Sequence, residues 1–132
     1  MNLFLVGLSY RTAPVSVRER YAVAPGQLAE RDAKLVVQAR LEEAALISTC
    51  NRTELLGASR RGDLALEQLH RFLREELGDG SALPSQIYEL RGGEVVRHLF
   101  RVAGGLDSMV LGEAQILGQV KDAYRASVEA HS

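Results

Sequence analysis

The sequence predicts an α+β fold in which a ferredoxin-like sheet subdomain, residues 1–90, precedes a small helical subdomain, residues 91–132. Apolar runs of strand length and amphipathic helical stretches alternate in the order strand, helix, strand, strand, helix, strand, as in the split βαβ arrangement. After Gly92 and Gly93 only helical spacing is found. The chain has 132 residues, of which 46% are hydrophobic and 25% charged. These values are typical of a single globular domain.

The first third of the chain is expected to form a strand and two helices. Residues 2–10 form an apolar run of strand length. Pro14, which lacks an amide hydrogen, suits the first turn of a short helix through residues 18–20. Pro25 opens a second helix to about Arg40 in the same way. The apolar stripe of this helix consists of Leu28, Leu35, Val36 and Ala39.

Two neighbouring strands, residues 44–49 and 53–58, are expected to meet around Cys50. A helix then begins with Asp63 as its N-cap and ends before Gly78, because these residue types favour helix ends. Its apolar face consists of Leu66, Leu69, Phe72, Leu73 and Leu77.

Two helices are expected after a last strand at residues 86–90. The first carries an apolar stripe that ends at Gly104 and Gly105, and the second runs from about Leu111 to Ala130. The stripe of the first helix consists of Val95, Val96, Leu99, Phe100 and Ala103.

Composition excludes several classes of protein. The 16 basic and 17 acidic residues give a net charge of −1, which argues against a broad basic surface for nucleic acid. One cysteine allows no internal disulfide and favours a reducing, cytoplasmic location. The apolar start of the chain is too short for a signal peptide, and no segment is long enough to span a membrane. The sequence has no glycine-rich nucleotide-binding motif and no metal-ligand cluster.

Cys50 is the first candidate catalytic residue. A thiol at the end of an apolar strand can be presented to a cleft as a nucleophile. Free cysteines are more often buried and inert, which is the competing interpretation. Residues 48–54 are seven polar or reactive residues in succession, which is an unusual composition for a protein core.

His98 and a pair of glutamines are weaker candidates. His98 lies at the edge of an apolar stripe and can point into a cleft, although a packing role is the commoner outcome. Gln115 and Gln119 are one helical turn apart and can share an amide face, or they can simply be solvated.

Taken together, the motifs closely resemble the N-terminal catalytic domain of glutamyl-tRNA reductase, over essentially the whole chain. The segments that carry the resemblance are residues 7–15, Arg18 and Glu19, residues 48–54, residues 98–103 and residues 105–116.

The resemblance implies a function in tetrapyrrole (5-aminolevulinate) biosynthesis. Cys50 would take glutamate from glutamyl-tRNA as a thioester, which NADPH reduces to glutamate 1-semialdehyde. It also implies that His98 supports catalysis. The implied substrate-binding residues are Thr49, Asn51, Arg52, Ser108, Glu113, Ala114, Gln115 and Gln119, with Arg52 as the fork for the substrate carboxylate.

Further expectations follow from the resemblance. NADPH would be bound by a domain that this chain lacks, and homodimers would form through another absent domain. Glutamyl-tRNA is the expected substrate and glutamate-1-semialdehyde aminotransferase a partner, with no membrane and no metal. By itself, the 132-residue chain would at most accept glutamate on Cys50 and lose it to water. Two alternatives remain open, namely a non-catalytic ferredoxin-like interaction domain and a generic thiol esterase.

Overall fold

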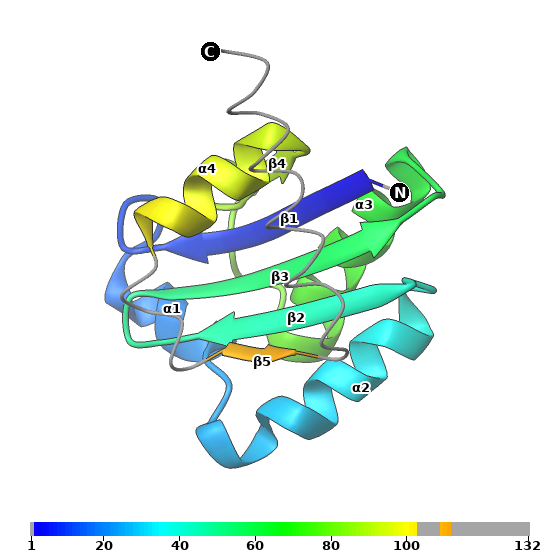
Figure 1. The fold of residues 1–132 in the computed structure, drawn as a ribbon. Helices are drawn as coiled ribbons and strands as arrows, with labels where there is room; N and C mark the ends of the chain where they lie inside the picture. Colours follow the sequence, from blue (N-terminus) through cyan, green and yellow to red (C-terminus); the bar gives the residue numbers. More distant parts are fainter. Residues whose placement is uncertain (1, 103–108, 112–132) are drawn as a thin grey trace.

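A computed structural model describes residues 2–102 and 109–111, which form one five-stranded antiparallel sheet with helices on both faces (Figure 1). The strands are β1 (Asn2–Ser9), β2 (Glu43–Ser48), β3 (Arg52–Ser59), β4 (Tyr88–Arg91) and β5 (Met109–Leu111). The α-helices are α1 (Val15–Tyr21), α2 (Leu28–Gln38), α3 (Asp63–Phe72) and α4 (Gly93–Arg101). Short helical turns are η1 (Pro25–Gln27), η2 (Leu73–Leu77) and η3 (Pro84–Gln86).

The strand order is β4-β1-β3-β2-β5. Every neighbouring pair is antiparallel, so β1 and β2 run in the same direction with β3 between them. The α+β class that the sequence predicts is confirmed.

The sheet has two apolar faces because the side chains of each strand alternate between them. One face packs against α1, α2 and α3, with Leu8 of β1 and Leu46 of β2 fully buried there. The other packs against α4 and buries Leu5 of β1 and Leu56 of β3. Figure 1 shows α4 in front of the β1 and β4 side of the sheet.

The sequence did not predict β5. It pairs with β2, with Leu46 opposite Val110, and extends the sheet by one short strand. A three-residue apolar segment has no alternation long enough to indicate a strand. Leu111, where a helix was expected to begin, is the last residue of β5. The rest of that expected helix lies outside the described residues, and the helical subdomain remains a prediction.

The start of α3 also differs from the prediction. Gly62, with a φ of 64°, occupies the N-cap position, and Asp63 is the first helical residue. The Asp63 carboxylate lies 2.7 Å from Nη1 of Arg91 on β4, so it makes an ion pair instead of capping the helix. The end of the helical stretch agrees with the sequence, because η2 continues α3 as far as Gly78.

Within the described part of the chain, no helix combines the length and the apolar character needed to cross a lipid bilayer.

Candidate active site

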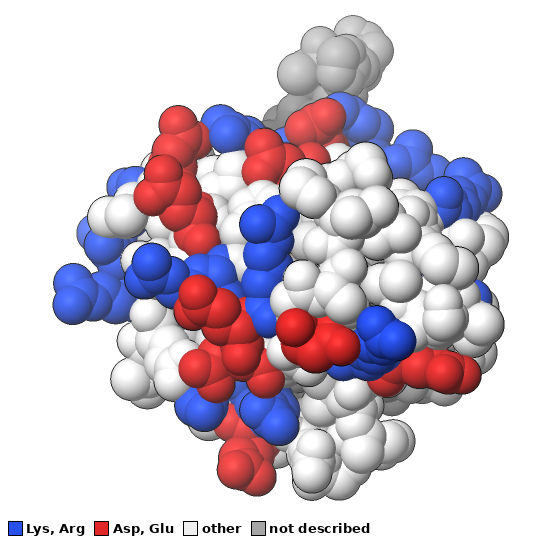
Figure 2. Space-filling model, turned by 180° about the vertical axis from the view of Figure 1, so that it is seen from behind, with Lys and Arg blue, Asp and Glu red and all other residues white. Residues whose placement is uncertain are grey.

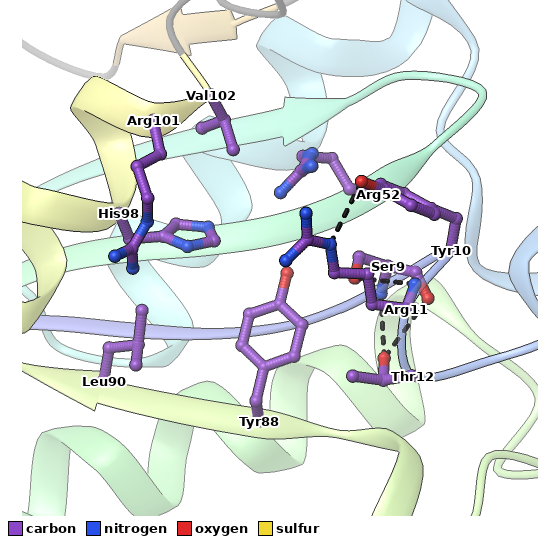
Figure 3. Close-up of a pocket in the computed structure, with 10 residues that line it drawn as sticks. All are labelled: Ser9, Tyr10, Arg11, Thr12, Arg52, Tyr88, Leu90, His98, Arg101 and Val102. Atoms are coloured by element: carbon purple, nitrogen blue, oxygen red, sulfur yellow. Dashed lines mark hydrogen bonds between the residues drawn. The ribbon is translucent and has the colours of Figure 1, made fainter.

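The site lies at one end of the sheet face that α4 covers, where β1 and β3 leave the core. A cavity of about 430 Å³ opens there (Figure 3). Its lining residues come from the β1–α1 loop, β3, β4 and the end of α4, and they are Ser9, Tyr10, Arg11, Thr12, Arg52, Tyr88, Leu90, His98, Arg101 and Val102.

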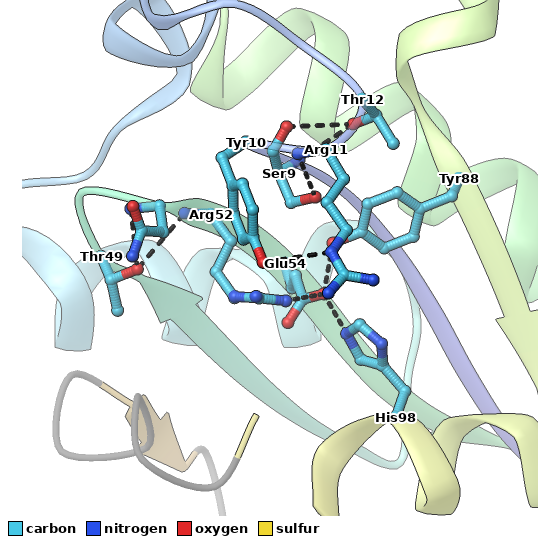
Figure 4. A network of polar contacts seen from close by, with 10 residues as sticks. Ser9, Tyr10, Arg11, Thr12, Thr49, Arg52, Glu54, Tyr88 and His98 are labelled. Atoms are coloured by element: carbon cyan, nitrogen blue, oxygen red, sulfur yellow. Dashed lines mark hydrogen bonds and ion pairs between the residues drawn. The ribbon is translucent and has the colours of Figure 1, made fainter. Parts of the chain in front are cut away.

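Glu54 of β3 is the centre of the polar network beside this cavity (Figure 4). Its side chain is fully buried, and its Oε2 accepts hydrogen bonds from Oη of Tyr88 and from Nε2 of His98. Nη1 of Arg52 lies 3.6 Å from the same oxygen. The second oxygen, Oε1, is buried and has no hydrogen-bond partner in the described residues. A buried carboxylate therefore holds a tyrosine, a histidine and an arginine at one point.

The network also fixes which groups donate protons. Burial, and then the negative charge of Glu54, raise the pKa of Tyr88. The phenol is therefore neutral and donates to Glu54. Nε2 of His98 faces the same carboxylate, and it donates to Glu54 in the tautomer that places the proton on this nitrogen.

Gly7 makes this network possible. It lies opposite Glu54 in the β1–β3 pair and opposite Tyr88 in the β1–β4 pair. A Cβ atom at Gly7 would come within 2.7 Å of the Thr53 carbonyl oxygen and 2.8 Å of Cγ of Glu54. The missing side chain therefore leaves room above β1 for the Glu54 carboxylate to meet Tyr88.

Cys50 is exposed in the short loop between β2 and β3. Oγ1 of Thr49 accepts hydrogen bonds from the backbone N–H groups of Asn51 (3.1 Å) and Arg52 (3.2 Å), which defines the turn. Nη1 of Arg18 on α1 donates to the Cys50 carbonyl oxygen over 3.3 Å. The thiol is thus held on a turn fixed by side-chain and backbone hydrogen bonds.

The Cys50 loop is joined to the cavity through the β1–α1 loop. The backbone N–H of Tyr10 donates to the Asn51 carbonyl oxygen over 2.8 Å. Beside it, Nε of Arg11 donates to Oη of Tyr10 over 3.1 Å. This hydrogen bond, with the positive charge of Arg11, lowers the pKa of Tyr10.

The cavity is suited to an anionic ligand. Arg11, Arg52 and Arg101 line it. The negative charge of Glu54 offsets only one of these three positive charges. A guanidinium group presents paired N–H donors that match a carboxylate or a phosphate.

The structure places some of the predicted site residues together. His98 and Arg52 meet at Glu54 and line the cavity, and Thr49, Cys50 and Asn51 form the adjoining turn. Cys50 itself is not among the residues that line the cavity. The remaining predicted residues lie outside the described part of the chain, and they are Ser108, Glu113, Ala114, Gln115 and Gln119.

Glu54, Tyr88 and Tyr10 are site residues that were not predicted from the sequence. The sequence does contain an indication of Glu54, because it is a charged residue in an apolar strand. If such a residue is buried, it must have a polar or charged partner. The sequence contains no such indication of Tyr88 and Tyr10, because they reach the cavity from two segments far apart in the sequence.

The described residues hold no group of three or more His, Cys, Asp or Glu side chains placed to bind a metal ion. They also lack a fitting cradle for a dinucleotide. Residues 10–14 connect β1 to α1 without a glycine, and the connection from β3 to α3 has only Gly62. Gly92 and Gly93 precede α4, but they are adjacent and lack the G-x-G-x-x-G spacing. Dinucleotide pyrophosphates need a glycine-rich turn before a helix, so NADPH does not fit on this part of the chain.

The fold and the site define an α+β domain that presents an exposed thiol next to an arginine-lined cavity. Comparison with known proteins identifies the family. The sequence profile described as "Glutamyl-tRNAGlu reductase, N-terminal domain" matches residues 6–132. The chain belongs to this family, which is named after a reductase.

Individual relatives agree with this assignment. The chain is 50% identical to the glutamyl-tRNA reductase of Salinispora arenicola over 125 residues, which cover 94% of this chain and 28% of that protein. It is 45% identical to glutamyl-tRNA reductase 2 of Koribacter versatilis, again with 94% and 28% covered. The solved glutamyl-tRNA reductase from Methanopyrus kandleri superposes with a TM-score of 0.53 and 35% identity over 96% of this chain and 28% of that one. The chain thus spans under a third of these relatives' length.

Proposed function

We propose that this domain binds glutamyl-tRNA and takes the glutamyl group onto Cys50 as a thioester. The observation that carries the proposal is the exposed Cys50 thiol, held on a turn hydrogen-bonded to the loop that lines an arginine-rich cavity. Family membership supports the choice of substrate, because the relatives are named as reductases of glutamyl-tRNA.

In the proposed step, Sγ of Cys50 forms a bond to the ester carbonyl carbon of glutamyl-tRNA. The bond from that carbon to the ribose oxygen breaks, and the proton of the thiol ends on the ribose hydroxyl. An aminoacyl ester is already activated, so a thiolate can displace the ribose without a metal ion.

Arg52 is proposed to bind the side-chain carboxylate of the substrate. Its side chain is 14% exposed and uses Nη1 towards Glu54, which leaves its other N–H groups for a ligand. His98 supports catalysis in this proposal through its position on Glu54. Thr49 and Asn51 shape the turn, and the remaining proposed substrate contacts are Ser108, Glu113, Ala114, Gln115 and Gln119.

For the whole protein, we propose reduction of the thioester by NADPH to glutamate 1-semialdehyde, which enters tetrapyrrole biosynthesis. NADPH supplies a hydride in that reaction. We assign no residue of the described chain to NADPH binding. Homodimer formation and transfer of the semialdehyde to glutamate-1-semialdehyde aminotransferase belong to the same proposal, as does a cytoplasmic location.

The test is acylation of the 132-residue chain. The chain is mixed with glutamyl-tRNA or with free glutamate, quenched in acid and measured by intact mass. We expect one glutamyl group per chain from glutamyl-tRNA, none from free glutamate and none with Cys50→Ser, which keeps the size of the side chain. We also expect slow release of glutamate and no semialdehyde from this chain.

The alternatives give different results. A non-catalytic interaction domain would show no adduct and slow alkylation of the thiol, although the exposure of Cys50 already speaks against a buried cysteine. A generic thiol esterase would accept simple esters as readily as glutamyl-tRNA. Either result would refute the proposal.

A further inference from the structure

Tyr10 is a large aromatic residue that is held in place and yet faces solvent. It follows β1 at the mouth of the cavity, and it is 50% exposed. The guanidinium carbon of Arg11 lies 5.6 Å from the centre of its ring, and Nε of Arg11 donates to its hydroxyl group. Cation–π contact and hydrogen bond together orient the ring, so little conformational entropy remains to be lost when a ligand binds.

The loop that carries Tyr10 is joined to the loop that carries the proposed nucleophile. The backbone N–H of Tyr10 is bonded to the carbonyl oxygen of Asn51, the residue after Cys50. Arg18 donates to the carbonyl oxygen of Cys50 itself. The aromatic ring and the thiol therefore lie on two loops that are directly hydrogen-bonded to each other.

The charge around this mouth is positive. Arg11 and Arg52 line the cavity beside Tyr10, and Arg18 borders the Cys50 loop. By contrast, the opposite face of the molecule carries acidic and basic side chains side by side (Figure 2). With a net charge of only −1, a polyanion would be attracted to a local group of arginines rather than to a broad surface.

An exposed aromatic ring with arginines around it has the chemistry that binds unpaired nucleotides. Bases outside a helix stack on Tyr rings and on guanidinium planes, while arginines contact the phosphates. The amino acid of an aminoacyl-tRNA is esterified to the terminal nucleotide of an unpaired 3′ end. The base that carries the ester must therefore lie close to the nucleophile whenever the ester does.

We propose that Tyr10 and Arg11 form a stacking platform for the terminal adenine of the tRNA acceptor end, and that the stacked base directs the ester towards Cys50. This inference rests on the proposed function, and it adds a nucleobase site to it. Arg11 is the partner that holds the ring, and Arg18 is available to the phosphate that precedes the base.

The test compares two minimal esters on the 132-residue chain. Glutamyl-adenosine carries the terminal base without a phosphate, whereas glutamate α-methyl ester carries neither. The measured quantity is the ratio of the two rates of adduct formation on Cys50. We expect the ratio to favour glutamyl-adenosine and to fall roughly tenfold or more in Tyr10→Ala, because stacking on an aromatic residue contributes this much to binding. Tyr10→Trp should keep the ratio.

A binding measurement separates this inference from the proposed function. A single-stranded CCA trinucleotide with 2-aminopurine as its last base should lose fluorescence when it stacks on the wild-type chain, and should lose much less with Tyr10→Ala. Leu83→Ala is the matched control, because Leu83 is a large apolar side chain of similar exposure (58% against 50% for Tyr10) that does not line the cavity.

The outcomes are distinct. Adducts that form equally from both esters, with fluorescence independent of Tyr10, would overturn the stacking platform and leave acylation of Cys50 intact. Quenching that depends on Tyr10, without any adduct on Cys50, would support the nucleobase site and refute the proposed acyl transfer. A tRNA-dependent rate that falls in Tyr10→Ala with an unchanged adenosine ratio would assign the effect to phosphate contacts and overturn the inference.

Discussion

Replacing Glu54 with glutamine tests the buried network most sharply, because the change removes one charge and keeps the shape. Glu54 is fully buried, and Tyr88, His98 and Arg52 all meet its Oε2. Hydrogen bonds to a charged group contribute about 1 kcal/mol more than those between neutral groups, so two such bonds account for about 2 kcal/mol. Loss of the counter-charge of the nearly buried Arg52 adds about 1 kcal/mol. We expect Glu54→Gln to lower the free energy of unfolding by about 3 kcal/mol.

Glu89→Gln is a matched control for this substitution. Glu89 is also a glutamate on a strand of the same sheet, and its Oε2 also pairs with a histidine, His70, at 2.8 Å. Its side chain is 45% exposed, and exposed ion pairs contribute about 0–1 kcal/mol. The two variants therefore differ mainly in burial.

The assay is urea unfolding at pH 7.5, followed by circular dichroism. With a slope of about 2 kcal/mol per molar urea, the midpoint of Glu54→Gln should lie about 1.5 M below that of the wild type. The midpoint of Glu89→Gln should lie less than about 0.5 M below it. Equal midpoints for the two variants would refute the view that Glu54 is a buried charge on which the network depends.

Three further predictions concern stability. Burial raises the pKa of Asp32 to about 7, so the folded state favours the protonated acid and stability falls as the pH rises from about 4 to 7. Asp32→Asn should match the wild type near pH 4 and exceed it by about 4 kcal/mol at pH 8 in urea unfolding, because each pKa unit is worth about 1.4 kcal/mol, whereas parallel pH profiles would contradict this. Gly7→Ala should lower the free energy of unfolding by about 2 kcal/mol in the same assay and reduce acylation of the chain, because its Cβ would displace Glu54. If neither quantity changes, the strand tolerates the methyl group. Tyr21→Phe should cost about 1.5 kcal/mol by thermal melting, since the buried Tyr21 hydroxyl accepts the Ala82 N–H over 3.0 Å, and an unchanged melting temperature would refute that role.

The sequence predicted the main strands and helices because their patterns are local. The apolar run of β1 and the stripe of α2, with Leu28 and Leu35 buried, follow directly from residue spacing. The strand β5 is too short to leave such a pattern. Asp63 has the residue type of an N-cap, but its carboxylate pairs with Arg91, which is 28 positions further along the chain. A local sequence pattern does not indicate that the ion pair with Arg91 replaces the helix cap.

The site was predictable only in part, for a similar reason. The polar run around Cys50 indicated the turn, and the edge position of His98 indicated a cleft. The polar network around Glu54 forms only where residues of β1, β3, β4 and α4 come together. It also needs Gly7, which leaves room for the Glu54 carboxylate. Such a meeting follows from strand register and helix packing, which a single sequence does not specify before the sheet order is known.

Transfer of the glutamyl group from glutamyl-tRNA to Cys50 can be tested by mapping the acid-quenched adduct. Peptides of the treated chain are sequenced by tandem mass spectrometry under conditions that preserve thioesters. We expect a glutamyl group on the peptide that contains Cys50, which hydroxylamine removes and which is missing from Cys50→Ser. A glutamyl group on another residue, or an unmodified Cys50 after incubation with intact glutamyl-tRNA, would contradict this expectation.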